Sequence, residues 1–284
     1  MSELIWSTDS AQSARRPIVV AAFAGYFNAG GAATAALDWL HEQNDPVELA
    51  VIDPETFFDF QQERPQVRLV DGKRIIDWPD TRCFALQSGE THDMLTITGV
   101  EPHLRWRTFA EQIVAIGKET GAELFVTLGA TPGVVPHTRP IEVVGSATDA
   151  ELALRLGLGR PTYEGPSGVM GVLHEAIDSA GMPVISLRVS VPHYVMGEPS
   201  PKATQALLAK LEQVTGVKTA AAGLDEQASD WQQMVDAAVI NDPEVLSYVG
   251  ELESTFDAED TLDLSVDLAA EVENFLRERN EGER

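Results

Sequence analysis

The segment Ile18-Val19-Val20-Ala21-Ala22-Phe23-Ala24 runs directly into Gly25-Tyr26-Phe27-Asn28-Ala29-Gly30-Gly31, and this junction carries the strongest structural signal in the chain. The apolar, partly β-branched first half predicts a buried strand. The second half predicts a glycine-rich turn, and Asn28 is a favourable cap for a small-residue helix over residues 29–40. A strand, a turn and a helix in this order form the repeating unit of an open α/β sheet.

Two further glycine-rich segments border strand and helix patterns in the same way. They are Leu128-Gly129-Ala130-Thr131-Pro132-Gly133 and Tyr163-Glu164-Gly165-Pro166-Ser167-Gly168. Loops that leave the carboxyl ends of strands converge on one edge of an α/β sheet, where ligands or partners usually bind. We therefore expect a binding site at this edge. None of the three loops has a metal cluster, a phosphate-binding lysine or a nucleophile in a recognised setting, so they indicate no particular chemistry.

Apolar runs alternate with helical patterns over most of the chain. The runs that predict strands are residues 18–24, 47–53, 83–87, 94–98, 124–128, 141–145 and 184–191. Helical patterns follow Asn28, begin near Trp106 and Val169, and start again at Ser200-Pro201. This alternation is typical of a parallel or mixed sheet covered by helices on both faces. In addition, Asp71-Gly72-Lys73 predicts the turn of a hairpin.

After Gly223 the strand signals end, and three acidic amphipathic helices are expected. Asp242-Pro243 is a capping signal for the second helix, and Asp260 is one for the third. Residues 225–284 hold 18 Asp or Glu against three Arg, which is 15 of the 25 net negative charges. We therefore divide the chain into an α/β core, residues 1–223, and an acidic helical appendage, residues 224–284. The apolar face of each helix has to be buried against the core or another subunit.

The composition excludes several classes of function. A net charge of −25 would repel phosphate backbones, which argues against nucleic-acid binding. No apolar run approaches the roughly 20 residues that a membrane-spanning helix needs. Residues 1–17 lack the apolar segment of a signal peptide, so we expect a cytoplasmic protein. The single cysteine, Cys83, excludes an intrachain disulfide and a cysteine-based metal site, and its apolar neighbours predict a core position.

Two motifs superficially resemble catalytic or phosphate-binding loops. Gly25 and Gly30 are spaced as in a P-loop, but Gly31 and Ala32 stand where that motif needs Lys and Ser or Thr. Anion binding by backbone amides is one function open to this turn, but tight packing on the sheet is the interpretation that we favour. Ser167 does not fit a nucleophile elbow, because the residue two after it is Val169 rather than Gly. Helix capping by Ser167 is the interpretation we favour.

The histidines and one arginine are the remaining candidates. His137, His174 and His193 lie in different predicted elements and have no metal-binding spacing, which leaves only a site assembled in three dimensions. Arg139 lies in the rigid segment Pro136-His137-Thr138-Arg139-Pro140, where it could bind a carboxylate or phosphate bidentately. Pairing with one of the protein's own acidic residues is the alternative that we favour. We predict no catalytic residues, no metal site and no cofactor.

Taken together, these motifs resemble the proteasome assembly chaperone 2 family in its actinobacterial-type form. The resemblance rests on Phe23-Ala24-Gly25-Tyr26-Phe27-Asn28-Ala29-Gly30, Leu128-Gly129-Ala130, Pro136-His137-Thr138-Arg139-Pro140, Tyr163-Glu164-Gly165-Pro166-Ser167-Gly168, Val191-Pro192-His193-Tyr194 and Pro199-Ser200-Pro201-Lys202-Ala203-Thr204. With the acidic helices it covers nearly the whole chain.

The resemblance implies a three-layer α/β/α domain of the phosphorylase/hydrolase-like type, with a mixed, mostly parallel sheet and a C-terminal helical appendage. It also implies a non-catalytic role, because the better-understood relatives act as scaffolds that help proteasome α-subunits assemble. Relatives that dock on proteasome rings often end in a hydrophobic-Tyr-X tail. This chain ends Asn280-Glu281-Gly282-Glu283-Arg284, so docking by such a tail is not expected.

Two hypotheses follow for the function. The leading one is a non-catalytic protein-binding scaffold, a cytoplasmic homo-oligomer without nucleic-acid or membrane partners, for which proteasome subunits are the suggested partner. The alternative is a small-molecule enzyme or sensor that uses the first glycine-rich loop with Arg139, Ser167 and His193. The candidate ligand- or partner-binding residues are Gly25, Tyr26, Asn28, Gly30, Gly31, Gly129, His137, Thr138, Arg139, Tyr163, Ser167, His193 and Tyr194.

Overall fold

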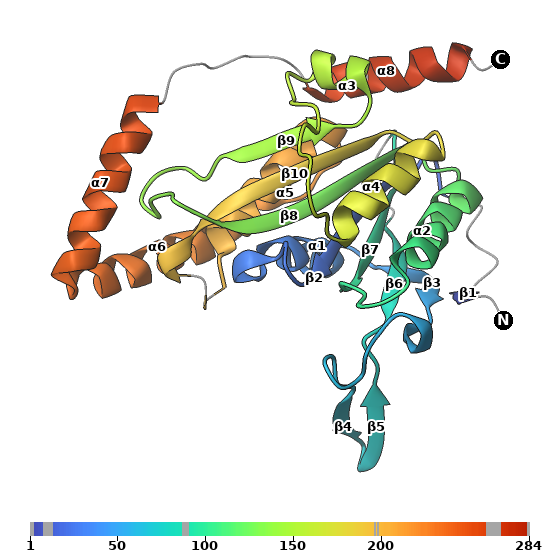
Figure 1. Ribbon diagram of the computed structural model, residues 1–284, viewed down its shortest axis with the longest axis horizontal. Helices are drawn as coiled ribbons and strands as arrows, with labels where there is room; N and C mark the ends of the chain where they lie inside the picture. The colour runs from blue at the N-terminus through green and yellow to red at the C-terminus, as the bar shows by residue number, and fades with distance from the viewer. Residues whose placement is uncertain are drawn as a thin grey trace.

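The computed structural model describes residues 3–7, 14–86, 91–195, 197, 199–259 and 268–282. Within them, eight strands form one mixed sheet in the order β1-β3-β6-β7-β2-β8-β10-β9 (Figure 1). The strands are β1 (Leu4–Trp6), β2 (Ile18–Ala24), β3 (Val47–Ile52), β6 (Thr81–Leu86), β7 (Met94–Val100), β8 (Leu124–Gly133), β9 (Val143–Ala147) and β10 (Val184–Pro192). The predicted strands are confirmed, although Gln87 lies outside the described residues.

The four central strands, β7, β2, β8 and β10, are parallel to one another. In the register of the sheet, Val20 of β2 lies between Thr96 of β7 and Val126 of β8. The flanking strands pair antiparallel, β6 on β7 at one side and β9 on β10 at the other. The carboxyl ends of the central strands therefore meet at one edge of the sheet, which we call the carboxyl edge.

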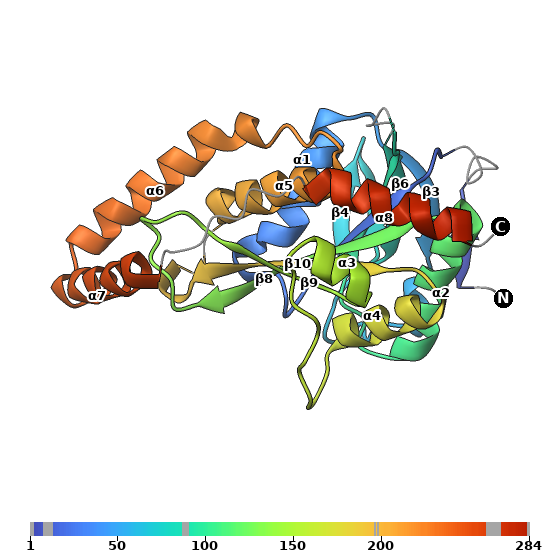
Figure 2. The same cartoon turned by 90° about the horizontal axis from the view of Figure 1, so that it is seen from above.

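Helices cover both faces of the sheet, and the three-layer α/β/α fold is confirmed (Figures 1 and 2). The helices α1 (Ala32–Gln43) and α5 (Pro201–Thr215) pack on one face, and α2 (Trp106–Thr120) and α4 (Val169–Ser179) pack on the other. Alternate residues of β2 serve the two cores, with Val20 on the α1 side and Val19 on the α2 side. Because both faces are covered, β2 reads as continuously apolar.

Short elements complete this body. They are the helix α3 (Ala150–Arg155) and the 3-10 turns η2 (Ala29–Gly31), η3 (Pro54–Thr56), η4 (His193–Val195) and η5 (Ala221–Leu224). Cys83 is buried as predicted, and burial raises the pKa of its thiol to about 12. At neutral pH this thiol is therefore not a nucleophile. In the described ranges, no helix is both long enough and apolar enough to cross a membrane.

The hairpin predicted at Asp71-Gly72 is confirmed. It consists of β4 (Gln66–Val70) and β5 (Lys73–Asp77), which form a separate two-stranded sheet that projects from the body (Figure 1). Asp71 and Gly72 both have positive φ, 50° and 73°, as the tight turn between two antiparallel strands requires.

The three acidic helices are confirmed, but they do not stay together. The first two, α6 (Asp225–Ile240) and α7 (Pro243–Glu259), lie beside the carboxyl edge, whereas α8 (Leu268–Gly282) packs on the main body beside α3 and α5 (Figures 1 and 2). Asp242 caps α7 as predicted, because its carboxylate accepts from the backbone N–H of Glu244 and Val245. Asp260 lies outside the described residues. The domain division at residue 223 stays a prediction.

Candidate functional site

The first glycine-rich loop is tightly packed at the carboxyl edge. Gly25 has a φ of 152°, and a Cβ there would lie 2.7 Å from the Glu101 side chain, so only glycine fits. The Glu101 carboxylate accepts from the backbone N–H of Phe27 at 3.3 Å. The Asn28 side chain accepts from two backbone N–H groups of α1, as predicted for a cap. The packing predicted for this turn is observed, and anion binding there stays untested.

The other two glycine-rich segments lie next to this one, but neither is a loop that leaves a strand. Residues 128–133 continue the strand β8, and residues 163–168 follow α3. The Phe27 carbonyl accepts from Ala130 N at 2.7 Å, which joins the first loop to the end of β8. A Cβ at Gly129 would lie 3.8 Å from the Phe27 side chain, and one at Gly168 would lie 3.8 Å from its ring. The prediction that the three glycine-rich segments converge at one edge is therefore confirmed.

Aromatic side chains extend from these loops into solvent. Tyr26 is 81% exposed and Tyr163 is 75% exposed. The Tyr163 hydroxyl donates to the Pro166 carbonyl at 3.1 Å, which holds this side chain over its own loop. Val134, directly after β8, is also exposed. Exposed tyrosines on short, well-anchored loops are typical of protein-binding surfaces.

The helix cap predicted at Ser167 is wrong. The cap residue of α4 is Gly168, without a side-chain cap bond, and the Ser167 hydroxyl donates to the Gly168 carbonyl at 3.2 Å. Ser167 is exposed, and the structure gives it neither a capping bond nor a basic partner among the described residues.

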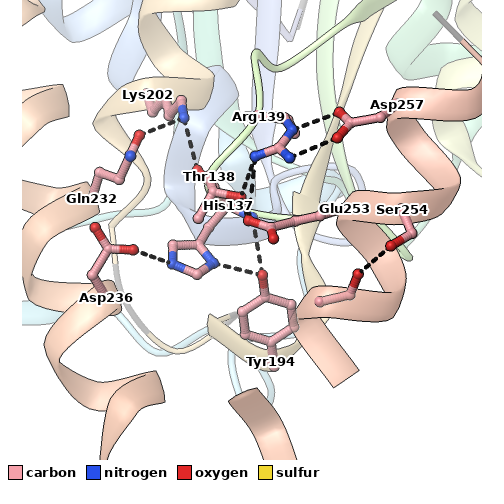
Figure 3. A network of polar contacts seen from close by, with 11 residues as sticks. His137, Thr138, Arg139, Tyr194, Lys202, Gln232, Asp236, Glu253, Ser254 and Asp257 are labelled. Carbon is pink, nitrogen blue, oxygen red and sulfur yellow. Dashed lines mark hydrogen bonds and ion pairs between the residues drawn. The ribbon is translucent and has the colours of Figure 1, made fainter. Parts of the chain in front are cut away.

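His137 is the centre of the network drawn in Figure 3. Its side chain is buried, with Nδ1 2.8 Å from Tyr194 Oη and Nε2 2.9 Å from Asp236 Oδ1. The backbone N–H of His137 donates to the same Tyr194 oxygen at 2.9 Å. The ring thereby links η4, which follows β10, to α6.

These contacts determine where the protons lie. Because Tyr194 Oη accepts from the His137 backbone, it can donate its own proton to Nδ1, and Nε2–H then donates to the Asp236 carboxylate. Burial lowers the pKa of His137 and raises the pKa of Tyr194. Both groups are therefore neutral near pH 7, and His137 acts as a structural link rather than a free base.

Thr138 and Arg139, which follow His137 in the segment 136–140, also bind to the acidic helices (Figure 3). Arg139 donates through Nε and Nη2 to the two oxygens of Asp257, each at 2.7 Å, and through Nη1 to Glu253 at 3.3 Å. Thr138 also donates to Glu253. The prediction that Arg139 pairs with the protein's own carboxylates is confirmed, and this pair holds α7 against the edge.

Lys202, in the first turn of α5, completes the network. Its ammonium donates to the His137 carbonyl and to Gln232 of α6, both at 2.7 Å. Burial lowers the pKa of Lys202. Nearby, the exposed His193 donates from Nδ1 to the Gly133 carbonyl at 3.1 Å, and its ring packs edge-on against Tyr194 and Tyr248. The segment 136–140 therefore holds both α6 and α7 through hydrogen bonds and ion pairs.

The alternative hypothesis required the first loop, Arg139, Ser167 and His193 to share one concave site. A cavity of about 760 Å³ does open beside Gly25, with Glu101, His103 and Trp106 in its wall. Arg139, Ser167 and His193 do not line it. Nor does any group of three or more metal-ligating side chains occur in the part of the chain that the structure describes.

Several residues of this edge could not be found from the sequence. Asp236, Glu253 and Asp257 are three of many carboxylates in the acidic helices, and each lies about 100 or more residues from its partner in the segment 136–140. The two prolines around His137 and Arg139 were the one available signal, since they mark a rigid segment whose polar side chains need partners.

Comparison with known proteins places this geometry in a family. A model of the PAC2 family matches residues 22–239. The chain is 42% identical to a PAC2 family protein from Streptomyces avermitilis, covering 82% of this chain and 99% of that chain with a TM-score of 0.76. It is 38% identical to a proteasome-assembly chaperone homologue from Mycobacterium tuberculosis, with the same coverage and a TM-score of 0.75.

A third solved structure extends further along the chain. It is a Mycobacterium tuberculosis protein of unknown function, 26% identical, which covers 90% of this chain and 89% of that chain with a TM-score of 0.80. The match of the family model to most of the chain, together with the identity to solved members, confirms the resemblance inferred from the motifs. The chain belongs to the PAC2 family.

Proposed function

We propose that this protein is a non-catalytic assembly factor for proteasome subunits, which it binds at the carboxyl edge. One observation carries the proposal. The polar residues that a catalytic site would need, His137 and Arg139, are engaged by the chain's own helices α6 and α7, whereas aromatic side chains of the same edge face solvent. An edge built in this way offers contact area rather than reactive groups.

Membership of the PAC2 family also supports a role in proteasome assembly. The relative from Mycobacterium tuberculosis is described as a proteasome-assembly chaperone homologue, and its alignment covers nearly all of that chain. Tyr26 and Tyr163 are the side chains we expect at the centre of the contact, because large, rigid aromatics dominate the energetics of protein interfaces.

The test uses purified proteasome α- and β-subunits from the same organism. We expect the full-length protein to retain α-subunits on an affinity column and to speed the appearance of assembled rings in native gels. The double variant Tyr26→Ala/Tyr163→Ala should lose most of the retention. A matched control, Leu154→Ala, removes another highly exposed side chain on α3 and should leave retention unchanged.

Two outcomes would contradict the proposal. If neither subunit type were retained and assembly rates were unchanged, the protein would not act on the proteasome. If retention were intact in the double tyrosine variant, the partner would bind elsewhere and the carboxyl edge would not be the interface.

A further inference from the structure

The β4–β5 hairpin presents an apolar face that nothing in the described chain covers. We call residues 64–78 the hairpin arm. In its register Val67 lies opposite Ile76 and Leu69 lies opposite Arg74, so these four side chains share one face. Val67, Ile76 and Leu69 are exposed, the last by 76%, and Trp78 beyond the strand is exposed too.

Such an arm is not stable by itself. A two-stranded hairpin in water is marginal, and it normally needs a third strand or a packing partner on its apolar face. Single exposed apolar residues are common on proteins, but a contiguous group of this kind marks an interaction site. The exposed apolar face of the arm therefore indicates a docking surface.

The charge of the arm indicates the chemistry of that partner. Residues 64–78 contain four Lys or Arg against two Asp, in a chain whose net charge is −25. Arg68 is paired with Asp77 across the strands. Within the described residues, no ion pair engages Arg64, Lys73 or Arg74, and all three are exposed. The partner should therefore combine carboxylates with exposed apolar side chains.

The helices α6 and α7 offer this combination. Residues 225–259 contain ten Asp or Glu and no Lys or Arg. Met234, Ile240 and Leu246 are exposed among them. In the described part of the chain, Glu244 and Glu251 are exposed carboxylates that no ion pair engages. This surface is complementary to the arm in both charge and polarity.

The two surfaces lie apart in one molecule. In Figure 1 the arm projects from the β6 side of the sheet, whereas α6 and α7 lie beyond its other half. We propose that the hairpin arm of one protomer docks its Leu69 face on the α6–α7 surface of a second copy of this chain. Because the two surfaces differ, the contact is heterologous and generates a closed ring or an open chain. It does not depend on a proteasome partner.

The first test measures the mass of the full-length protein by size-exclusion chromatography with light scattering. We expect an oligomer for the wild type, and loss of that species to a monomer in Leu69→Asp. Lys73→Glu/Arg74→Glu, which leaves the apolar residues in place, should give the same loss. Leu154→Asp adds the same charge at a residue that is 83% exposed on α3 and should leave the oligomer intact. Circular dichroism checks that each variant is folded.

The second test is complementation. Ile240→Lys/Leu246→Lys damages only the α6–α7 surface, and Leu69→Asp damages only the arm. A mixture of the two monomeric variants retains one intact arm and one intact α6–α7 surface, so we expect a heterodimer. A monomeric wild type, an oligomer unaffected by the arm variants, or a mixture without heterodimer would each overturn the proposal.

Discussion

At the scale of single residues, the contact between Tyr194 and His137 satisfies two polar groups of a buried residue with one oxygen. The phenol oxygen serves both the backbone N–H and the ring Nδ1 of His137. Tyr194→Phe leaves both groups buried without this partner, and an unsatisfied buried polar group costs about 1–3 kcal/mol. We expect denaturant unfolding to report a loss of this size. Tyr26→Phe, which removes the hydroxyl of a side chain that is 81% exposed, should change the stability little.

A second prediction at this scale concerns His174, which should make the stability of the protein depend on pH. It lies on α4, with Nε2 2.9 Å from Thr127 Oγ1, and burial together with the charge of Arg188 lowers its pKa to about 4. The unfolded chain takes up the proton near the ordinary value of 6.5, so the folded state loses stability as the pH falls below it. The linkage amounts to about 2 kcal/mol between pH 7 and pH 5.

Unfolding free energies at these two pH values check this prediction. His174→Gln removes the titration and can keep a hydrogen bond to Thr127. The variant should therefore lose less stability than the wild type on acidification. His137, whose pKa burial also lowers, acts in the same direction and remains in both proteins. Equal losses in the two proteins would show that His174 is not the titrating group.

At the scale of elements, α7 depends on one arginine. Arg139 provides the bidentate contact to Asp257 and the contact to Glu253, and α7 has few other polar links to the edge. Arg139→Ala should speed hydrogen exchange across α7 while the strands of the sheet stay protected. Arg139→Lys should restore little of the protection of α7 from hydrogen exchange, because an ammonium cannot make the two parallel hydrogen bonds of a guanidinium. Arg107→Ala, which changes an exposed arginine on α2, is the control. Equal exchange across α7 in Arg139→Ala and Arg107→Ala would show that Arg139 does not hold α7.

Local patterns predicted the elements because their causes are local. The apolar run of β2 and the positive φ at Asp71 and Gly72 depend on neighbours in the sequence, so strand and turn were both found. The helix cap predicted at Ser167 is absent because its hydroxyl donates to the Gly168 carbonyl instead, and the sequence pattern does not distinguish these two hydrogen bonds. The partners of Arg139 were equally hidden, since selecting Asp257 among many carboxylates requires the tertiary fold.

At the scale of the whole molecule, the acidic segment has two separate positions. The helices α6 and α7 lie at the carboxyl edge, whereas α8 lies near the amino ends of the central strands. There Glu273 contacts both Arg16 and His92, at 2.8 Å each, just before β2 and β7. The sequence showed one acidic appendage, because charge and amphipathicity are alike in all three helices. Removal of everything after residue 223 would therefore disturb two surfaces at once.

The position of α8 leads to a prediction about stability. Phe275 and Leu276 are buried in the same core as β8 and β10, and Arg155 lies 5.8 Å above the Phe275 ring. Leu276→Ala should cost about 2–5 kcal/mol, because it removes buried methyl groups and leaves a cavity. Leu246→Ala on α7 changes the same residue type at an exposed position and should cost far less. Urea unfolding of both variants measures the difference. If the two losses were equal and small, α8 would be a loosely attached tail rather than part of the core.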